Sequence, residues 1–324
     1  MSSLPTSLST ALDEEISRFP YSKLQKAAEE LSRRYRQQVE GHMMWSEIDR
    51  LAYVAMRLPA TYAVVKKVLE ETHLRMFDAK LETLLDLGAG PGTVMWAAQA
   101  ALPHLKHVTE VEQDEELIAL GQRLAAHNPS SVQWMKQDIT HLPALEPHDV
   151  VVLSYVIGEL SQEALETLLL KAWQLARQTL VIIEPGTPHH FVKVLQARTL
   201  MIQAGAFLVA PCPHALQCPL AAAGDWCHFY ERVERSRLHR QLKAAELGYE
   251  DEKYSYIVAA KVPGESYPAR IVRAPQRHSG HVEFQLCTAE GLKHKTLSRR
   301  DKENYKKARK LDWGDILTRD QLGS

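Results

Sequence analysis

A glycine-rich loop is the first feature of this 324-residue sequence that could do chemistry. The sequence LLDLGAGPGT, at residues 84–93, places Gly88, Gly90 and Gly92 between an apolar run and a segment with helical periodicity. Glycines let the backbone pass close to a ligand, and the N-terminus of a following helix presents free N–H groups. A dinucleotide-binding fingerprint needs glycine at position 93, which is Thr, so this loop does not match it.

Acidic residues at the ends of the expected strands indicate the kind of ligand. Four of these strands end in Asp86, Glu112, Asp138 and Glu184. Strand ends border the ligand crevice in this architecture, and an acidic rim repels a pyrophosphate but attracts a sulfonium and an amino group. We therefore expect S-adenosylmethionine, with Glu112 near the ribose hydroxyls and Asp138 near the adenine amino group. The alternative is that some of these acids are helix N-caps or solvated strand ends, and we favour it for Glu184.

The end of the fourth expected strand is where a methyl acceptor should lie. There the sequence reads SYVIGEL, and Ser154, Tyr155 and Glu159 are the acceptor-site candidates. The Asp/Asn-Pro-Pro-aromatic tetrapeptide of many amino-methylating enzymes is missing, and no cysteine lies near strands four or five. Because methyl transfer can proceed largely by proximity and orientation, we expect an S-adenosylmethionine-dependent methyltransferase whose catalytic residues and acceptor are unknown.

Four cysteines are the second group with chemical potential. Three of them lie within a segment of 16 residues that has no periodic apolar face, and the fourth lies 60 residues later: Cys212, Cys218, Cys227 and Cys287. Zinc sites usually show cysteine pairs with two to four intervening residues, and no such pair is present. Thiolates at wider spacings suit an iron–sulfur cluster, with zinc or unpaired structural cysteines as alternatives. His214 and His228 adjoin the cysteines, and for them we favour a role outside the ligand set.

The elements that must position these residues follow from the apolar periodicity. Short apolar runs at 81–88, 107–112, 132–138, 149–155 and 179–186 predict strands, and the stretches 92–104, 114–127, 161–176 and 188–204 predict helices. This alternation predicts a doubly wound, Rossmann-like α/β fold with a parallel sheet. Residues 11–76 read as helical, and Pro59 is expected to end or kink one helix and start another.

The chain is expected to have four parts. These are a helical cap at 1–78, an S-adenosylmethionine-binding methyltransferase-like domain at 79–205, a cysteine-rich part at 206–269 and a basic part at 270–324. The third part should contain an irregular cysteine loop, a basic helix within 231–246 and a strand at 254–261. The fourth should contain a hairpin formed by ARIVRAP and GHVEFQLC, followed by a basic tail.

The charge distribution predicts a polyanionic partner. The chain has 39 Lys+Arg and 40 Asp+Glu, but from Arg270 onward the numbers are 13 and 7, or +6, which leaves 26 and 33, or −7, for the rest. An uncompensated basic segment suits a phosphate backbone, so the RNA-binding candidates are Arg299, Arg300, Lys302, Lys306, Lys307, Arg309 and Lys310. The basic run around 232–243 could equally be a solvated helix. Tyr305 and Trp313 could stack on bases or pack the tail onto the body.

Composition excludes several classes of protein. With 45% hydrophobic and 24% charged residues the chain reads as globular, and its longest apolar stretch is shorter than the ~20 residues needed to cross a bilayer. The first 19 residues resemble neither a secretory signal nor an Arg-rich transit peptide. We therefore expect a cytoplasmic protein with no membrane partner, and a monomer.

Several motifs together resemble a known family. They are APCPH-x3-CPL, DWCHF, GYEDEKYSYIVAAK, LDLGAGPGT, VIIEPGTP, RLPATYAVV and RRDKENYKKARKLDWGD, which span nearly the whole chain. They resemble the methyltransferase-like family of small-ribosomal-subunit assembly proteins of bacteria and mitochondria. The resemblance implies a class I S-adenosylmethionine fold, a 4Fe-4S cluster on the four cysteines, and association with the small ribosomal subunit and its RNA.

Two functional hypotheses follow from the residues and the resemblance together. The first is a methyltransferase that acts on small-subunit ribosomal RNA. The second is a non-catalytic assembly factor that binds S-adenosylmethionine and uses the cluster as a structural latch or an iron sensor. The intact cofactor acids favour the first, and the missing acceptor tetrapeptide favours the second.

Overall fold

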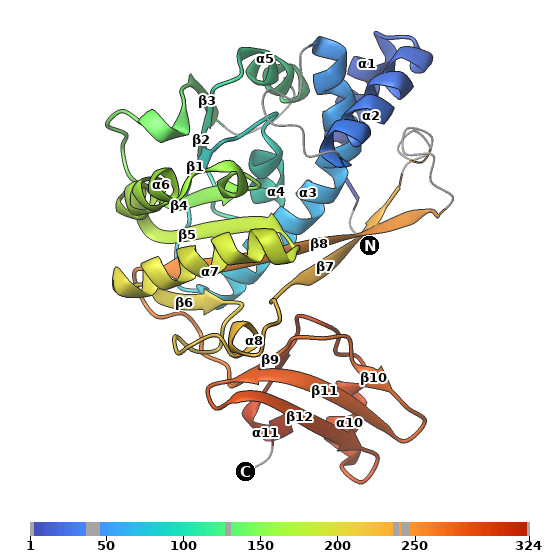
Figure 1. The fold of residues 1–324 in the computed structure, drawn as a ribbon, viewed down its shortest axis with the longest axis vertical. Coiled ribbons are helices and arrows are strands. Elements are labelled where there is room, and N and C mark those ends of the chain that lie inside the picture. The colour runs from blue at the N-terminus through green and yellow to red at the C-terminus, as the bar shows by residue number, and fades with distance from the viewer. Residues whose placement is uncertain (1–2, 37–45, 127–130, 236–239, 241–246, 323–324) are drawn as a thin grey trace. The chain divides into compact units, whose positions relative to one another are not determined.

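The computed structural model describes residues 3–36, 46–126, 131–235, 240 and 247–322. The chain divides into two compact units. Unit 1 contains Met1–Glu70, Leu81–Leu145 and Glu231–Glu252, and unit 2 contains Glu71–Lys80, Glu146–Tyr230 and Lys253–Ser324. Figure 1 labels most of the helices and strands of both units.

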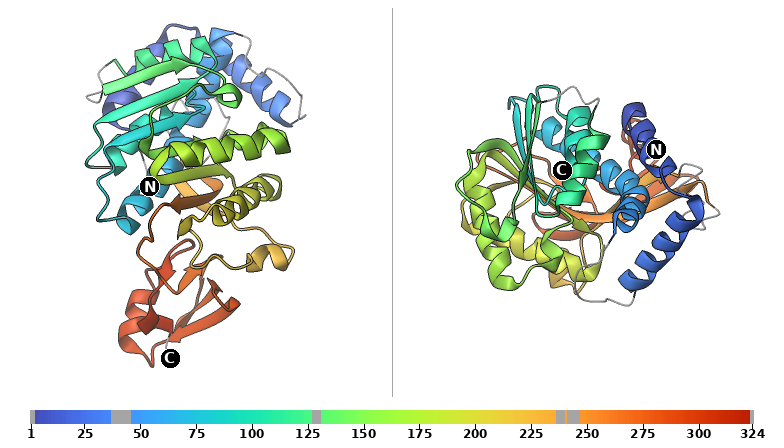
Figure 2. Two further views of the ribbon diagram at one scale, coloured as in Figure 1. Left: turned by 90° about the vertical axis from the view of Figure 1, so that its left-hand side faces the viewer. Right: turned by 90° about the horizontal axis from the view of Figure 1, so that it is seen from above.

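Unit 1 begins with three helices, of which the third crosses into unit 2. They are α1 (Thr6–Ser17), α2 (Tyr21–Arg36) and α3 (Glu47–Arg75). Helix α1 contacts both α2 and α5 (Glu115–Leu124), and the right-hand view of Figure 2 shows the blue α1 close to the green α5. The apolar positions Leu24, Ala28 and Leu31 of α2 are buried, as their helical spacing predicts.

Helix α3 runs without interruption through Pro59. A proline removes one backbone hydrogen bond, but Leu58 and Ala60 on either side of it are at most 1% exposed. The Thr61 hydroxyl donates to the Arg57 carbonyl at 3.0 Å, one turn back. The expectation that one helix ends at Pro59 and another begins is therefore wrong, because burial of both flanking turns outweighs the loss of one bond.

The strands of unit 1 that lie nearest the glycine loop are parallel. They are β1 (Thr83–Leu87), β2 (His107–Glu112) and β3 (Ser131–Lys136), in the order β3-β2-β1. Helix α4 (Thr93–Ala101) follows β1, and six of its nine residues are buried. The three strands therefore bring their carboxyl ends, and the residues that follow them, to one edge.

The segment Glu231–Glu252 corrects one prediction. Residues expected to begin a basic helix form strand β7 (Phe229–Glu234), which pairs with β8 (Tyr249–Ala260). Arg232 binds Asp251 at 2.7 Å and Arg235 binds Glu250 at 3.0 Å. The helix prediction is wrong for β7, because pairing with β8 provides both backbone partners and compensating charges. The rest of the run, 236–239 and 241–246, lies outside the described residues.

Unit 2 contains a second group of strands with two long helices. Strands β4 (His148–Ser154) and β5 (Ala176–Pro185) are parallel, β8 is antiparallel to β5 and to β6 (Phe207–Ala210), and the order is β4-β5-β8-β6. Helices α6 (Gln162–Leu175) and α7 (Pro188–Gln203) contact each other and β5. The predicted α/β fold with parallel strands is confirmed.

The C-terminal part of unit 2 is a small folded body around its own sheet. Strands β9 (Ala269–Ile271), β10 (Gln276–Arg277), β11 (His281–Thr288) and β13 (Ile316–Leu317) follow the order β10-β11-β9-β13, and β12 (Gly291–Ser298) pairs with β11. The predicted antiparallel pairing of ARIVRAP with GHVEFQLC is confirmed for β9 and β11. Two short helices complete this part, α10 (Lys302–Ala308) and α11 (Arg319–Leu322).

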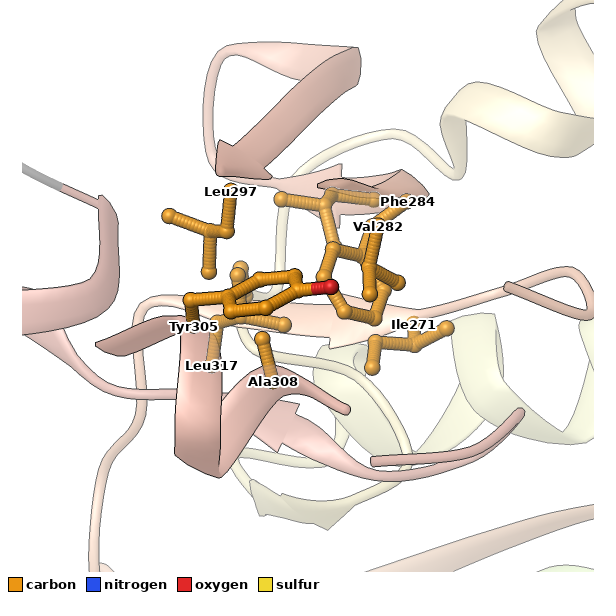
Figure 3. Close-up of a cluster of buried hydrophobic side chains, with 9 residues drawn as sticks. Ile271, Val282, Phe284, Leu297, Tyr305, Ala308 and Leu317 are labelled. Atoms are coloured by element: carbon orange, nitrogen blue, oxygen red, sulfur yellow. The ribbon is translucent and has the colours of Figure 1, made fainter. Parts of the chain in front are cut away.

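A hydrophobic core holds these C-terminal elements together. Figure 3 shows the ring of Tyr305 from α10 among Leu297, Val282 and Leu317. The expected basic tail is therefore a folded segment, because its scattered apolar residues converge on the sheet. Tyr305, 8% exposed, packs in this core and is not presented to a base.

Among the described residues, no helix is both long and apolar enough to pass through a lipid bilayer.

Candidate cofactor and cluster sites

The glycine loop follows β1 and precedes α4 in unit 1. Gly88, Gly90 and Gly92 all have positive φ angles, of 85°, 54° and 81°, a conformation that side chains disfavour. A Cβ at Gly92 would lie 3.1 Å from the Trp134 ring, whereas one at Gly90 would meet nothing within 4 Å. The loop therefore needs glycine for its conformation, and the space beside Gly90 is open to a ligand.

Glu112 holds the glycine loop from the end of β2. Its Oε2 accepts the Gly90 N–H at 2.8 Å, and its Oε1 accepts the N–H groups of Gln113 and Asp114 at 2.8 and 2.9 Å. The side chain is only 9% exposed. Glu112 thus ties the loop to β2, next to the position where the sequence analysis expects a ribose.

Asp86 lies beneath the loop and faces a second buried carboxyl that the sequence analysis missed. Asp86 and Glu110 are register partners on β1 and β2, at 1% and 0% exposure. Burial raises the pKa of Asp86 to about 7 and the pKa of Glu110 well above its usual value, and the nearby Glu112 charge adds to both shifts. A backbone hydrogen bond from Met95 offsets part of the shift of Glu110. The parallel register of β1 and β2 could have revealed Glu110, since both acids occupy the fourth position of their strands.

Asp138 lies two residues beyond β3 and caps a turn. It accepts hydrogen bonds from the Thr140 N–H and hydroxyl, both at 2.8 Å, at the start of the 3-10 helix η1 (Ile139–His141). These bonds lower the pKa of Asp138. Asp138 is therefore the N-cap residue of η1, which is one of the alternatives considered for the acids. A role for Asp138 toward adenine stays a prediction.

The acceptor-site candidates lie in unit 2, around the turn after β4. Ser154 ends β4, Tyr155 has a positive φ of 60°, and Glu159 is exposed in the 3-10 helix η2 (Ile157–Glu159). A tyrosine in the left-handed region is strained by about 1–3 kcal/mol, and such strain often accompanies functional sites. Their role stays a prediction.

Glu184 organises the same turn from the end of β5. Its Oε1 accepts the N–H groups of Val156 and Ile157, each at 2.8 Å, and its side chain is buried. Burial raises the pKa of Glu184 to about 7, against the lowering effect of these hydrogen bonds. Glu184 therefore has a structural partner set, although it is neither the helix N-cap nor the solvated strand end considered for it from the sequence.

All four cysteines line one pocket in unit 2. They come from the loop after β6, the N-cap of α8 (Pro219–Ala222), the segment before β7, and strand β11: Cys212, Cys218, Cys227 and Cys287. The pocket volume of about 520 Å³ includes space open to solvent. Its walls are otherwise largely apolar, with Leu220 and Val272 packed against three of the cysteines.

Burial raises the pKa of three of these thiols, those of Cys212, Cys227 and Cys287. Burial raises the pKa of Cys227 well above its usual value, and the other three cysteines add to the shift. Burial also raises the pKa of Cys287 to about 12. Thiolates bind metals and thiols do not, so a metal group in this pocket must displace protons and needs compensating positive charge.

Two buried arginines supply positive charge at the pocket. Arg198 of α7 donates its Nε–H to the Cys212 Sγ at 3.4 Å and another N–H to the carbonyls of His214 and Leu216, at 3.0 and 2.7 Å. Arg270 of β9 binds the Pro211 carbonyl at 3.0 Å and pairs with Glu71. Sequence reasoning missed both, because Arg198 lies inside a helix and Arg270 inside a strand, far from the cysteines in sequence.

Among the described residues, the four sulfurs are not drawn together as closely as they would be around one ion. Thiolates around a zinc ion, at Zn–S distances of about 2.3 Å, lie about 3.8 Å apart. Among the described residues, the ligand groups with all atoms within 4.8 Å of one another include no three of these cysteines. Four cysteine sulfurs around a wider space fit the ligand set of an iron–sulfur cluster.

The two histidines beside the cysteines differ in their surroundings. His214 Nε2 lies 3.6 Å from the Cys287 Sγ and lines the pocket. The ring of His228 stacks on Trp226 at 4.8 Å and meets the edge of Trp313 at 4.7 Å. Trp313 thus packs against the cysteine-rich segment.

The seven RNA-binding candidates are all exposed. They lie on α10 and in the segments that flank it. Lys307 pairs with Glu303 at 3.2 Å, and within the described part of the chain none of the other six has an ion-pair partner. These side chains can form a positive surface, but their contact with RNA stays a prediction.

Comparisons with known proteins give further findings. A family model described as mitochondrial small ribosomal subunit Rsm22 matches residues 47–318. The human mitochondrial ribosome assembly protein METTL17 is 27% identical over 300 residues, which cover 84% of this chain and 64% of that protein. The mitochondrial Rsm22-cox11 tandem protein 2 of Schizosaccharomyces pombe is 25% identical over 331 residues. This match covers 82% of this chain and 43% of that protein. The chain spans less than two thirds of the length of these curated relatives.

Among solved structures, the magnesium protoporphyrin IX methyltransferase of Synechocystis PCC 6803 with bound SAM matches with a TM-score of 0.41. It is 14% identical, and the match covers 71% of this chain and 90% of that one.

The comparisons also correct the expected location. The relatives just described, and the matching family, are named mitochondrial, so the expectation of a cytoplasmic protein is wrong. That expectation rested on the composition of 19 residues. A targeting segment is short and does not depend on the folded body. The residue composition of one short stretch is therefore weak evidence for a compartment.

Proposed function

The chain belongs to the family of mitochondrial small ribosomal subunit Rsm22 proteins, and from this premise we propose that it associates with the small ribosomal subunit during assembly. The family match over residues 47–318 carries the proposal, because it includes the glycine loop, the four cysteines and most of the basic C-terminal part. The relative METTL17, named a ribosome assembly protein, supports it.

Sedimentation tests this association. Full-length protein in a lysate of its own cells or organelles is expected to sediment with free small subunits and their precursors. When assembly is blocked before the ribosomal RNA folds, the protein should no longer sediment with small subunits or their precursors. Sedimentation only as the free protein at low salt would remove the proposal.

The cysteine pocket would hold a 4Fe-4S cluster. Cys212, Cys218, Cys227 and Cys287 would supply the four thiolates, with Arg198 and Arg270 offsetting their negative charge. Since the ligands come from four separate segments of unit 2, the cluster would join the loop after β6 to the C-terminal sheet. A structural latch is the role that this arrangement supports best.

Iron analysis tests the cluster. Protein purified without oxygen is expected to be brown, with about four irons per chain. Cys218→Ser should lower both the iron content and the thermal stability, because metal binding and folding of the loop are coupled. A colourless protein that contains zinc and no iron would contradict the assignment.

The glycine loop would hold S-adenosylmethionine. The open space beside Gly90, the acid Glu112 and the buried Asp86 are the observations that support this. Bound there, the cofactor supplies an electrophilic methyl group, and the residues of this chain would contribute its orientation. Methyl transfer to small-subunit ribosomal RNA is the catalytic form of the proposal.

A substitution at Gly90 separates cofactor binding from folding. Asn tolerates positive φ angles, so Gly90→Asn should keep the loop while its side chain fills the open space. S-adenosylmethionine binding, measured by calorimetry, should be lost. The control Gly205→Asn, which also has a positive φ and open space, should bind normally.

The second candidate is a non-catalytic assembly factor that retains the pocket. The missing acceptor tetrapeptide after β4 favours it. Transfer of labelled methyl groups to immature small subunits, lost in Gly90→Asn, would support the enzyme. Normal subunit assembly with Gly90→Asn, and no methyl transfer by the unchanged chain, would support the non-catalytic factor.

A further inference from the structure

A cluster of metal-binding side chains lies on the hairpin of β10 and β11 and has no part in the sites described above. The ligand atoms of His278, His281 and Glu283 all lie within 4.8 Å of one another. His281 Nε2 is 3.1 Å from the Glu283 Oε1, and the rings of His278 and His281 stack at 4.4 Å. We propose that these three residues form a binding site for a divalent transition metal, with zinc as its ion.

The ligand types and their spacing fit zinc. Two histidines and a carboxylate are a set found in zinc sites that keep the fourth position open for water or another ligand. Ligand atoms about 2.0–2.1 Å from a tetrahedral ion lie about 3.3 Å apart. The separation of 3.1 Å between His281 and Glu283 is already close to that value, and a rotation of the exposed His278 ring would complete the set.

The hairpin holds the three residues on rigid backbone. The His278 N–H donates to the His281 carbonyl at 2.9 Å and closes the turn, and the Arg299 N–H donates to the Gly280 carbonyl at 3.0 Å. Val282 and Phe284, each 1% exposed, anchor β11 from its opposite face. The alternation of a strand therefore directs His281 and Glu283 to the same outer face.

The strand-register partners of the two β11 ligands are uncharged. Glu283 is paired with Gln276 on β10 and with Thr296 on β12, and His281 is paired with Ser298. None of these three side chains carries a charge. The site is also accessible, since His281 and Glu283 side chains are 37% and 44% exposed.

A simple hydrogen bond between His281 and Glu283 is the competing explanation of the short contact. That bond has no need of His278, whereas zinc binding does. The variant His278→Ala therefore separates the two explanations, because it leaves the bond intact and removes one ligand.

The test is titration of the full-length chain, purified without oxygen, with Zn²⁺ by calorimetry and with Co²⁺ by absorption. Cobalt in a histidine–carboxylate site absorbs in the visible, and thiolate ligation adds a strong near-ultraviolet band, so the two kinds of site are distinguished. We expect one zinc ion bound outside the cysteine pocket. His278→Ala and His281→Ala should each weaken its binding by more than about tenfold, because changes outside the ligand set alone cost on the order of 10–100-fold.

His294→Ala is the matched control, since His294 is an exposed histidine on the adjacent strand β12. It should bind zinc like the unchanged chain. Zinc binding of unchanged affinity in His278→Ala, or cobalt bound only by thiolates, would overturn the proposal. All three substitutions are at exposed or half-exposed positions, and the melting temperature of each variant verifies its folding.

Discussion

At the residue scale, four ionisable side chains are buried near the two candidate sites. Arg198 and Arg270 are 6% and 3% exposed at the cysteine pocket, and Asp86 and Glu110 are buried below the glycine loop. A buried charge is costly unless it is paired or bound to a ligand. These four residues are therefore where substitutions should have the largest effect.

Arg198→Gln should weaken cluster retention. The change removes the N–H bond to the Cys212 Sγ and disturbs the bonds to the loop carbonyls, each charge-assisted bond being worth about 1.5–3 kcal/mol. We expect less iron per chain and faster bleaching in air, measured by iron analysis and absorption. Arg177→Gln on the exposed side of β5 is the control, and full iron content with normal air stability in Arg198→Gln would contradict the role.

The carboxyl pair of Asp86 and Glu110 predicts a pH dependence of stability. Because both folded-state pKa values lie above the unfolded values of about 4, the folded chain keeps the pair protonated to higher pH than the unfolded chain does. This contribution to stability is lost as pH rises from about 4 through about 7. Glu110→Gln should reduce the fall in the free energy of unfolding between pH 5 and pH 8 by on the order of 1 kcal/mol. Urea unfolding at both pH values measures this, with the exposed Glu29→Gln as control. An equal fall in Glu110→Gln and the unchanged chain would refute the assignment.

At the element scale, the glycine loop depends on how α5 packs against β3. A Cβ at Gly121 of α5 would lie 2.5 Å from the Trp134 ring of β3 and 3.0 Å from the carbonyl oxygen of Pro91 in the loop. Helix, strand and loop therefore meet where there is no space for a methyl group. The loop conformation is set by this packing as well as by its own glycines.

Gly121→Ala should accordingly affect both stability and cofactor binding. Overpacking is expected to cost about 1–3 kcal/mol, and displacement of Pro91 should lower the affinity for S-adenosylmethionine. Thermal unfolding and calorimetric titration measure the two effects. Gln122→Ala, at the exposed neighbouring position, should change neither, and normal cofactor affinity in Gly121→Ala would show that the loop is independent of α5.

At the scale of the whole molecule, the separation of charge predicts which part of the chain would make the proposed contact with RNA. The +6 charge from Arg270 onward includes exposed side chains around α10, whereas the rest of the chain is −7. Neutralised phosphates release counterions, so binding should weaken steeply with salt. The basic C-terminal part should therefore dominate association with ribosomal RNA.

Replacing Lys306 and Lys310 by Glu tests this distribution. We expect weaker binding to small-subunit RNA and a logarithmic salt slope reduced by about 2, one for each lost phosphate contact. Lys23→Glu with Lys26→Glu on α2 makes the same change in net charge at exposed positions and is the control. Equal weakening in both double variants would point to net charge and not to a surface on α10.

Local patterns in the sequence were sufficient to predict strands β1 to β5 and the helices that alternate with them. Strands β1 to β5 lie within a few residues of their predicted bounds, because each is a continuous apolar run between turn signals. Predictions failed where a tertiary partner reversed a local preference. Pro59 lies inside α3, and the basic run that begins at Glu231 starts as strand β7.

The sequence by itself determined which residue types are present for chemistry: three glycines in one loop, acids after parallel strands, four cysteines and a basic end. Only the tertiary structure decided which of them meet. It gathered four cysteines around one pocket, added Arg198 and Arg270 to it, set Glu110 against Asp86, and folded the expected tail into a core around Tyr305. The physical reason is that periodicity and turn chemistry act over a few residues, whereas burial, charge pairing and ligand geometry depend on residues distant in sequence.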